Sequence, residues 1–154
     1  MSVIETRLAE LGLTLPQASA PAANYVPYVK TGNLVIVSGQ ITMLNGELKY
    51  LGHVGKDLTT EQAYAAAKLC GLNLIAQVKA ACDGDLDRVK RVVRLGGFVS
   101  CTPDFVDHPK VINGASDLMA EVFGQAGHHA RAAVGVASLP LGVSVEVEGM
   151  FEIE

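Results

Sequence analysis

The sequence has no tryptophan, only three cysteines and few charged residues, and these shortages exclude several classes of protein. Aromatic residues make up 5% of the 154 residues and charged residues 18%. Cys70, Cys82 and Cys101 are an odd number at wide spacing, which excludes a full disulfide framework and a Cys-x-x-Cys metal site. We interpret all three as small core residues.

Positive charge is scarce as well. Twelve Lys and Arg residues stand against 16 Asp and Glu, which gives a net charge of −4. An acidic protein is poorly suited to follow a phosphate backbone. The one basic cluster, from Arg88 to Arg94, has no aromatic residue interleaved to stack bases. We therefore expect no nucleic-acid partner.

Long apolar runs are missing too. Leu34 to Val37 and Ala132 to Ala137 are the longest, far below the roughly 20 residues that span a bilayer. Glu5, Arg7 and Glu10 interrupt the N-terminal segment, which is unlike a secretory signal. These features predict a cytoplasmic protein with no membrane partner.

What the sequence does have is material for one hydrophobic core, because 49% of its residues are hydrophobic. A chain of this length fits one domain. Ile4, Leu8 and Leu11 follow helical spacing up to Gly12. We expect an N-terminal helix and connector over residues 1–24, with a proline-containing stretch at Leu15 to Pro27, and a single domain over residues 25–154.

The pattern of the main domain alternates strands with two long helices. Asn45-Gly46 predicts a hairpin turn, and Thr59 with Gln62 forms a possible capping box for a helix of about 22 residues. Pro109 suits the first turn of a second helix that ends at Gly124. Strands are expected at 34–38, 89–101, 130–137 and 143–153. This order predicts an α+β fold in which two long helices pack on one face of a mixed β-sheet.

Alternation then assigns side chains to the two faces of that sheet. In the last strand Val145, Val147 and Phe151 share one side, which we expect under the helices, whereas Glu146 points to the open face. In the strand before it Arg131 shares a side with residues as small as Ala and Gly. We place that side, which also holds Ala133, Gly135 and Ala137, on the open face.

An arginine among small neighbours is well suited to bind a carboxylate, since its planar fork donates two parallel hydrogen bonds. A structural ion pair with Glu146 or Glu148 is the alternative interpretation of Arg131. Glu146 is itself either functional or a solvated residue of an alternating strand. These alternatives stay open at the level of residue patterns alone.

The histidines do not predict a metal. His128 and His129 are adjacent, so on an extended strand they point to opposite faces, and no carboxylate lies at helical ligand spacing from them. Asp104, Asp107 and His108 flank Pro103 and Pro109, a spacing that turn and helix-cap chemistry requires. We interpret His128 and His129 as a solvated loop after Gly127. The sequence predicts neither a metal nor another cofactor.

Several segments nonetheless occur in a recognisable order. They are Pro27-Tyr28-Val29, Gly32 through Gln40, Asn113, Arg131-Ala132-Ala133-Val134-Gly135-Val136-Ala137-Ser138-Leu139-Pro140 and Val145-Glu146-Val147-Glu148. The sequence resembles the RidA/YjgF family, also labelled L-PSP endoribonuclease, and within it a longer subgroup with an N-terminal extension. The resemblance covers about residue 22 to the C-terminus.

This resemblance implies a chorismate-mutase-like fold and a homotrimer with clefts between subunits. RidA-type members hydrolyse reactive enamines and imines, such as 2-aminoacrylate, to 2-keto acids and ammonia. By resemblance Arg131 binds the carboxylate, Glu146 positions water and the backbone of Gly39 lines the site. Asn113 and Tyr28 match cleft positions supplied partly by the neighbouring subunit. The expected activity is that of a 2-iminobutanoate/2-iminopropanoate-type deaminase, a hydrolase acting on C=N bonds, and it needs no cofactor.

The sequence also departs from the family pattern. Members often carry Ser or Thr directly after the arginine and in some cases Cys one position further, where this chain has Ala132 and Ala133; the usual Pro-Ala before the arginine is His129-Ala130. The alanines make a second function credible, in which the protein binds 2-keto acids or related small carboxylates as a metabolite sensor without turnover. A ribonuclease, the third possibility, is opposed by the acidic charge.

Overall fold

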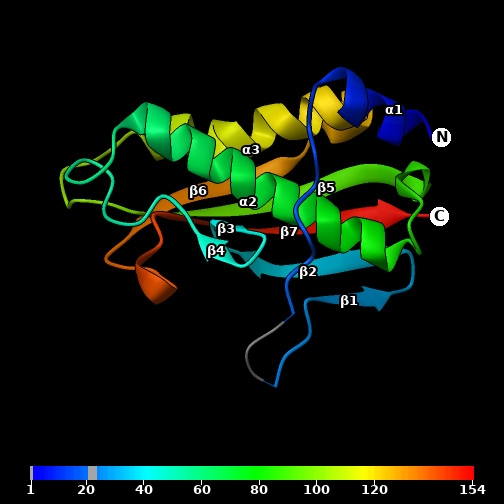
Figure 1. The fold of residues 1–154 in the computed structure, drawn as a ribbon, viewed down its shortest axis with the longest axis horizontal. Helices are drawn as coiled ribbons and strands as arrows, with labels where there is room; N and C mark the ends of the chain where they lie inside the picture. The colour runs from blue at the N-terminus through cyan, green and yellow to red at the C-terminus, as the bar shows by residue number, and fades with distance from the viewer. Residues whose placement is uncertain (1, 21–23) are drawn as a thin grey trace.

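The computed structural model describes residues 2–20 and 24–154 and shows a layer of helices on one face of a five-stranded sheet (Figure 1). The sheet has the order β1-β2-β7-β5-β6, and only β5 and β6 pair in parallel. Its strands are β1 Tyr28–Thr31, β2 Leu34–Gln40, β5 Val89–Ser100, β6 Ala130–Val136 and β7 Val145–Ile153. The expected mixed sheet with helices on one face is confirmed.

The helices are α1 Val3–Glu10, α2 Thr60–Ala81 and α3 His108–Phe123, with the short 3-10 helices η1 Leu86–Arg88, η2 Gly124–Gly127 and η3 Pro140–Gly142. Thr59 caps α2 by accepting from Gln62 N at 3.2 Å, while Gln62 Oε1 accepts from Thr59 N at 2.8 Å. The predicted capping box is therefore confirmed. Pro109 lies in the first turn of α3, as expected.

The small hairpin of β3 Met43–Leu44 and β4 Glu47–Leu48 confirms the turn predicted at Asn45-Gly46. Asn45 has φ 50° and Gly46 φ 89°. A two-residue turn with positive φ at both positions matches the twist of the strands that it joins, and Asn-Gly adopts it at little cost. This hairpin projects beside α2 in Figure 1 and follows directly from the end of β2.

β7 lies between β2 and β5 and carries the centre of the core. Its residues alternate between buried and half-buried, with Val145, Val147, Phe151 and Ile153 under the helices. Glu146 points to the other face, because residues of opposite parity in a strand point to opposite faces. The predicted faces of this strand are confirmed.

The predicted faces of β6 are wrong. Arg131 pairs with Leu95 and Ala133 with Gly97 on β5, and Leu95 is fully buried under the helices. Arg131, Ala133 and Gly135 therefore face the helices, and the open face of β6 carries two alanines and two valines, Ala130, Ala132, Val134 and Val136. The residues of both faces are small, so alternation offers no contrast; the register with β5 decides the face.

The open face of the sheet exposes aliphatic side chains. Val29 on β1 is 49% exposed, Ile36 on β2 41% and Val134 on β6 45%. The register places all three on the face away from the helices. An apolar face of this kind is typical of a surface that a partner covers.

The N-terminal segment is attached to the domain at the start of α1. The carboxylate of Asp87 accepts hydrogen bonds from the N–H groups of Val3 and Ile4, both at 3.0 Å, at the start of α1. The chain then crosses α2 towards the β1 side of the sheet (Figure 1). The expected connector, Leu15 to Pro27, includes residues 21–23, which lie outside the described residues. Within the described ranges, none of the helices combines the length and the apolar character that a membrane span requires.

Candidate functional site

Glu146 sits in a niche on the open face, next to Gly39. The side chain of Glu146 occupies the space that a Cβ on residue 39 would need, because such an atom would overlap Glu146 Oε2. Burial raises the pKa of the Glu146 carboxyl above its ordinary value, and the negative charge of Glu148 adds to the effect. The raised pKa of Glu146 is closer to neutral pH than that of an ordinary glutamate. A carboxyl group whose pKa is near the working pH can both accept and release a proton.

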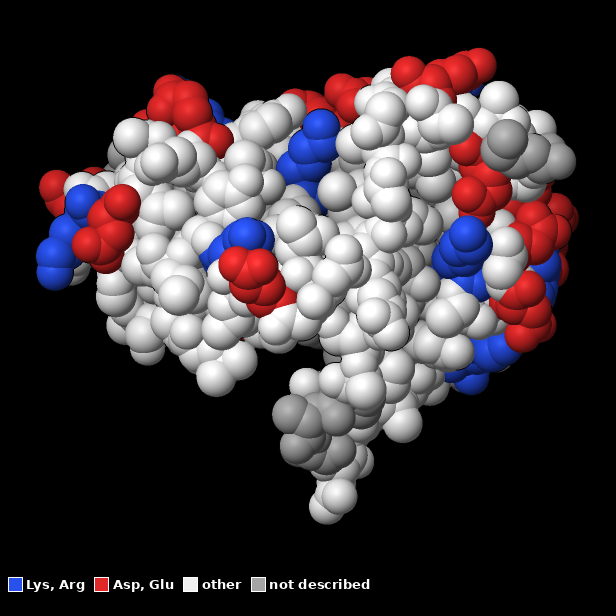
Figure 2. Space-filling model, viewed as in Figure 1, with Lys and Arg blue, Asp and Glu red and all other residues white. Residues whose placement is uncertain are grey.

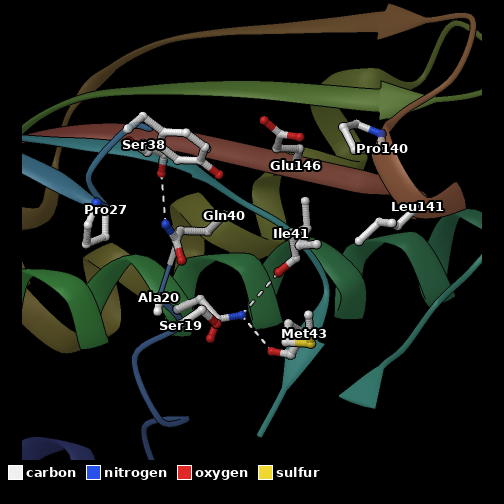
Figure 3. Close-up of a pocket in the computed structure, with 13 residues that line it drawn as sticks. Ser19, Ala20, Pro27, Ser38, Gln40, Ile41, Met43, Pro140, Leu141 and Glu146 are labelled. Atoms are coloured by element: carbon white, nitrogen blue, oxygen red, sulfur yellow. Dashed lines mark hydrogen bonds between the residues drawn. The ribbon is translucent and has the colours of Figure 1, made fainter. Parts of the chain in front are cut away.

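A cleft of about 400 Å³ opens in front of this carboxylate and is called here the Glu146 cleft. Its walls come from the end of β2, the turn with Pro140 and Leu141, and the segments on either side of residues 21–23 (Figure 3). In the space-filling view the surface is hollowed between the part of the chain that carries η3 and the segment that leads into β1 (Figure 2). The lining is mainly apolar, so a carboxylate at its base is poorly solvated.

Two amides on α2 hold the walls of this cleft, and the sequence interpretation missed both. Asn73 Nδ2 donates to the carbonyl oxygens of Ile41 at 3.1 Å and Met43 at 2.8 Å (Figure 3). Gln77 Nε2, one turn further on, donates to Ser19 O at 2.9 Å. The N-terminal extension therefore forms part of the cleft. Two amides one helical turn apart within the otherwise apolar stretch 69–78 were the signal that could have revealed them.

Arg131 projects from β6 towards α3, where three acceptors hold its guanidinium. Nη1 donates to Asn113 Oδ1 at 2.9 Å and to Ser116 Oγ at 3.0 Å, and Nη2 donates to Pro109 O at 3.3 Å. Arginine has five N–H donors, so Nε–H and one N–H of Nη2 remain without a partner in residues 2–20 and 24–154. Two adjacent nitrogens with free donors suit the two oxygens of one carboxylate.

The ion pair considered for Arg131 does not form. Glu148 pairs instead with Arg94, at 3.2 Å between Nη1 and Oε2, and no carboxylate lies within salt-bridge distance of Arg131 in the described parts of the chain. Arg131 is thus a half-buried cation held by neutral oxygens. An arginine that is oriented but not neutralised is well suited to bind an anion.

The residues proposed for the site fall into two groups that one chain does not bring together. Glu146 and Gly39 lie on the open face, whereas Arg131 and Asn113 lie on the helix side at the β6 edge. Tyr28 belongs to neither group. It lies on β1, where it pairs with Val37 of β2, and it packs against the core. Its neighbours Tyr25 and Pro27 line the Glu146 cleft instead.

The histidines after η2 differ from each other. His128 is exposed, as expected for a solvated loop, but His129 is half-buried and bonded through both ring nitrogens. The solvated-loop interpretation is therefore wrong for His129. No group of three or more His, Cys, Asp or Glu side chains that could hold a metal occurs in the described residues.

A second cleft, of about 400 Å³, lies at the far end of β6 and contains Cys101. Its Sγ is 3.5 Å from Nε2 of His108. Burial raises the pKa of the Cys101 thiol, so the pair lacks the low thiol pKa that an activated nucleophile needs. Cys70 and Cys82 are buried, as expected of core residues, but Cys101 is partly exposed.

Fold and site together define a class, an α+β protein of the chorismate-mutase-like fold with a glutamate in an apolar cleft and, at a sheet edge, an arginine that has no carboxylate partner in the described residues. The family model described as "YjgF/chorismate_mutase-like, putative endoribonuclease" matches residues 5–152. The chain belongs to this family, the RidA/YjgF family.

The proteins that this chain is similar to range from one of unknown function to one named as a deaminase. The crystal structure of Atu1372 from Agrobacterium tumefaciens, of unknown function, is 53% identical, with a TM-score of 0.93 over 99% of this chain and 93% of that one. Protein TCP17 of Trypanosoma cruzi is 48% identical over 97% of this chain and 94% of its own length. A 2-iminobutanoate/2-iminopropanoate deaminase of Dermatophagoides farinae is 29% identical over 92% of this chain and 95% of its own length.

Proposed function

We propose that this protein hydrolyses reactive enamines and imines of small amino acids, of the 2-aminoacrylate type, to 2-keto acids and ammonia in the cytoplasm. The observation that carries the proposal is Arg131, an oriented guanidinium with two free N–H donors and no carboxylate partner in the described residues. The relative named as a deaminase supports the same chemistry.

The reaction requires a held substrate, a water and a proton acceptor. Arg131 binds the substrate carboxylate through Nε–H and Nη2–H, and Glu146 holds the attacking water. As the water oxygen bonds to the C=N carbon, Glu146 takes a proton from the water and passes it to the imine nitrogen, which gives a carbinolamine. Glu146 then moves the proton of the carbinolamine hydroxyl to the amino nitrogen as the C–N bond breaks, so that ammonia and the keto acid leave and Glu146 is again a carboxylate. Such an imine is already reactive, so positioning and proton transfer are sufficient.

Because Arg131 and Glu146 lie on opposite faces of one sheet, a site that uses both takes them from two copies of the chain. We propose a homotrimer in which the Arg131 edge of one subunit meets the Glu146 cleft of the next. The exposed aliphatic side chains of Val29, Ile36 and Val134 support burial of the open face. A closed ring of three such contacts has one site at each interface.

Binding without turnover is the second candidate function. Ala132 and Ala133 favour it, since they offer no hydroxyl or thiol beside Arg131. Ribonuclease activity has less support, because the face in Figure 2 shows acidic and basic residues in small mixed groups rather than a basic track. An acidic protein without such a track binds RNA poorly.

The test generates imino acids in situ with an amino-acid oxidase and measures whether the protein accelerates ammonia release. Arg131→Ala should abolish both the acceleration and 2-oxobutanoate binding. Lysine should restore only a fraction, because losing the bidentate geometry costs about 1–3 kcal/mol. Glu146→Gln should keep ligand affinity and lose turnover. A wild-type protein that binds 2-oxobutanoate but never accelerates ammonia release would establish the binding function instead.

A further inference from the structure

Arg131 is the first member of a chain of hydrogen bonds that ends on the backbone. Nη1 of Arg131 donates to Ser116 Oγ at 3.0 Å, Ser116 Oγ lies 2.8 Å from His129 Nε2, and His129 Nδ1 lies 2.7 Å from Gly127 O. All four residues belong to α3, β6 or the turn between them. The carboxylate-binding group is thus connected to a fixed point of the fold.

The chemistry of the groups gives this chain one direction. A carbonyl oxygen only accepts, so the Nδ1 of His129 carries the hydrogen and donates to Gly127 O. In the neutral ring Nε2 is then an acceptor, which makes the Ser116 hydroxyl its donor. The lone pairs of Ser116 Oγ are left for the N–H of Arg131. With a neutral His129 ring, this arrangement satisfies each group of the chain.

The end of the chain is rigid. A Cβ at Gly127 would overlap Met119 O, so this residue packs directly on the backbone of α3. Ser116 and Asn113 lie one turn apart on the same helix and accept the two hydrogens of Arg131 Nη1. The guanidinium therefore cannot rotate without losing bonds on both sides, and its free donors stay at Nε and Nη2.

We propose that His129 and Ser116 are positioning residues that fix the orientation in which Arg131 receives the substrate carboxylate. The inference rests on the proposed function of Arg131. Neither residue touches the substrate. The planar guanidinium itself fixes the spacing of the two donors. The role of His129 and Ser116 is to keep these donors pointing towards the substrate carboxylate, a direction that a freely rotating side chain would adopt only part of the time.

Two substitutions of His129 distinguish the hydrogen bond between its Nε2 and Ser116 from the space that the ring fills. In His129→Gln the amide oxygen reaches the place of Nε2 and can accept from Ser116. In His129→Asn the shorter amide reaches only the place of Nδ1, so Ser116 loses its acceptor. Ser116→Ala removes the link and Ser116→Thr keeps the hydroxyl. His128→Ala is the matched control, since His128 is exposed.

Two measurements are made on the full chain: calorimetric titration with 2-oxobutanoate, and KM and kcat for an imine generated in situ. His129→Asn and Ser116→Ala should weaken binding about tenfold, the effect of one hydrogen bond to a charged group. KM should rise by the same factor with kcat nearly unchanged, as expected when substrate and transition state lose equally. His129→Gln, Ser116→Thr and His128→Ala should stay near wild type.

Wild-type affinity in His129→Asn and Ser116→Ala would overturn the inference, and so would equal losses in His129→Gln and His129→Asn. The nitrogen chemical shifts of the His129 ring in the wild-type protein report its tautomer without any substitution; a hydrogen on Nε2 would also overturn it. If Arg131→Ala still binds 2-oxobutanoate, the proposed function itself is wrong.

Discussion

Glu146 is a residue whose pKa depends on both its burial and a neighbouring charge. Its carboxyl lies half-buried in a mainly apolar cleft, and Glu148 follows two residues later on the same face. Both effects disfavour the charged form and raise the pKa of Glu146. The unfolded chain releases this proton more easily than the folded protein does.

Glu146→Gln should therefore stabilise the protein at neutral pH. Because the folded state holds the proton more tightly, the wild type loses stability as pH rises from the ordinary value of 4.5 to the raised pKa of Glu146. Glutamine carries no charge and avoids this loss. The Tm of the variant should exceed that of the wild type at pH 7 and approach it below pH 4.5, measured by thermal unfolding across the range.

Glu148→Gln is the control at this scale. It removes the exposed ion pair with Arg94 and should cost less than about 1 kcal/mol, as such pairs usually do. A Glu146→Gln variant that follows the wild-type Tm at every pH would show that Glu146 is fully hydrated in solution.

At the scale of elements, α2 and α3 approach each other closely at two glycines. A Cβ on Gly114 would overlap the backbone oxygen of Tyr64, whereas one on Gly71 would meet mainly the side chain of Leu118, at 2.9 Å. Backbone cannot move aside without shifting a helix, but a leucine side chain can adjust. The two glycines are therefore unequal, although both are buried in helices.

Gly114→Ala should destabilise the protein by about 1–3 kcal/mol, the usual cost of overpacking. Gly71→Ala should be close to neutral, because a gain of up to about 1 kcal/mol in helix propensity offsets the crowding. Urea unfolding of the two variants measures the difference. Equal stabilities would mean that the helices can separate freely at the Tyr64 contact.

Sequence patterns predicted an element correctly where apolar and polar residues alternate or where a local rule applies. β7 alternates aliphatic and acidic residues, and Thr59 and Gln62 satisfy a local rule, so both were predicted correctly. The residues of β6 that surround Arg131 are nearly all alanine, glycine and valine, and its face depends on its register with β5. Local patterns do not contain that register.

The candidate site could be predicted only in part for a related reason. Arg131, Glu146, Gly39 and Asn113 were identified from motifs, and the structure places each beside one other member of the set. The contribution of the N-terminal extension was not foreseen, since it depends on Gln77 meeting Ser19, 58 residues away. Long-range contacts between a side chain and a backbone carbonyl leave no periodic signal.

At the scale of the whole molecule, Arg131 and Glu146 lie on opposite faces of one sheet. The proposed site therefore requires two subunits, and mixing two inactive variants tests this requirement. Mixed trimers of coexpressed Arg131→Ala and Glu146→Gln subunits, each inactive alone, should recover about one third of wild-type turnover. A head-to-tail ring of three that contains both kinds of subunit has one interface at which an intact Arg131 meets an intact Glu146. Ammonia release from mixed trimers, isolated with two different tags, is the measurement.

Light scattering of the wild type supplies the control, with an expected mass of about three times 16.1 kDa. Mixed assemblies that remain inactive would contradict a shared site, since complementation requires residues from two subunits. A stable monomer at micromolar concentration would contradict it as well.

The central position of β7 has a consequence for how the chain is made. β7 follows every other strand in the sequence yet separates β2 from β5. Until β7 emerges from the ribosome, β2 and β5 have no strand to pair with on the side that β7 occupies in the folded protein. Such edges pair readily with other chains. Nascent chains that stall before Val145 should therefore aggregate or require a chaperone, whereas completion of a single nine-residue strand closes the sheet.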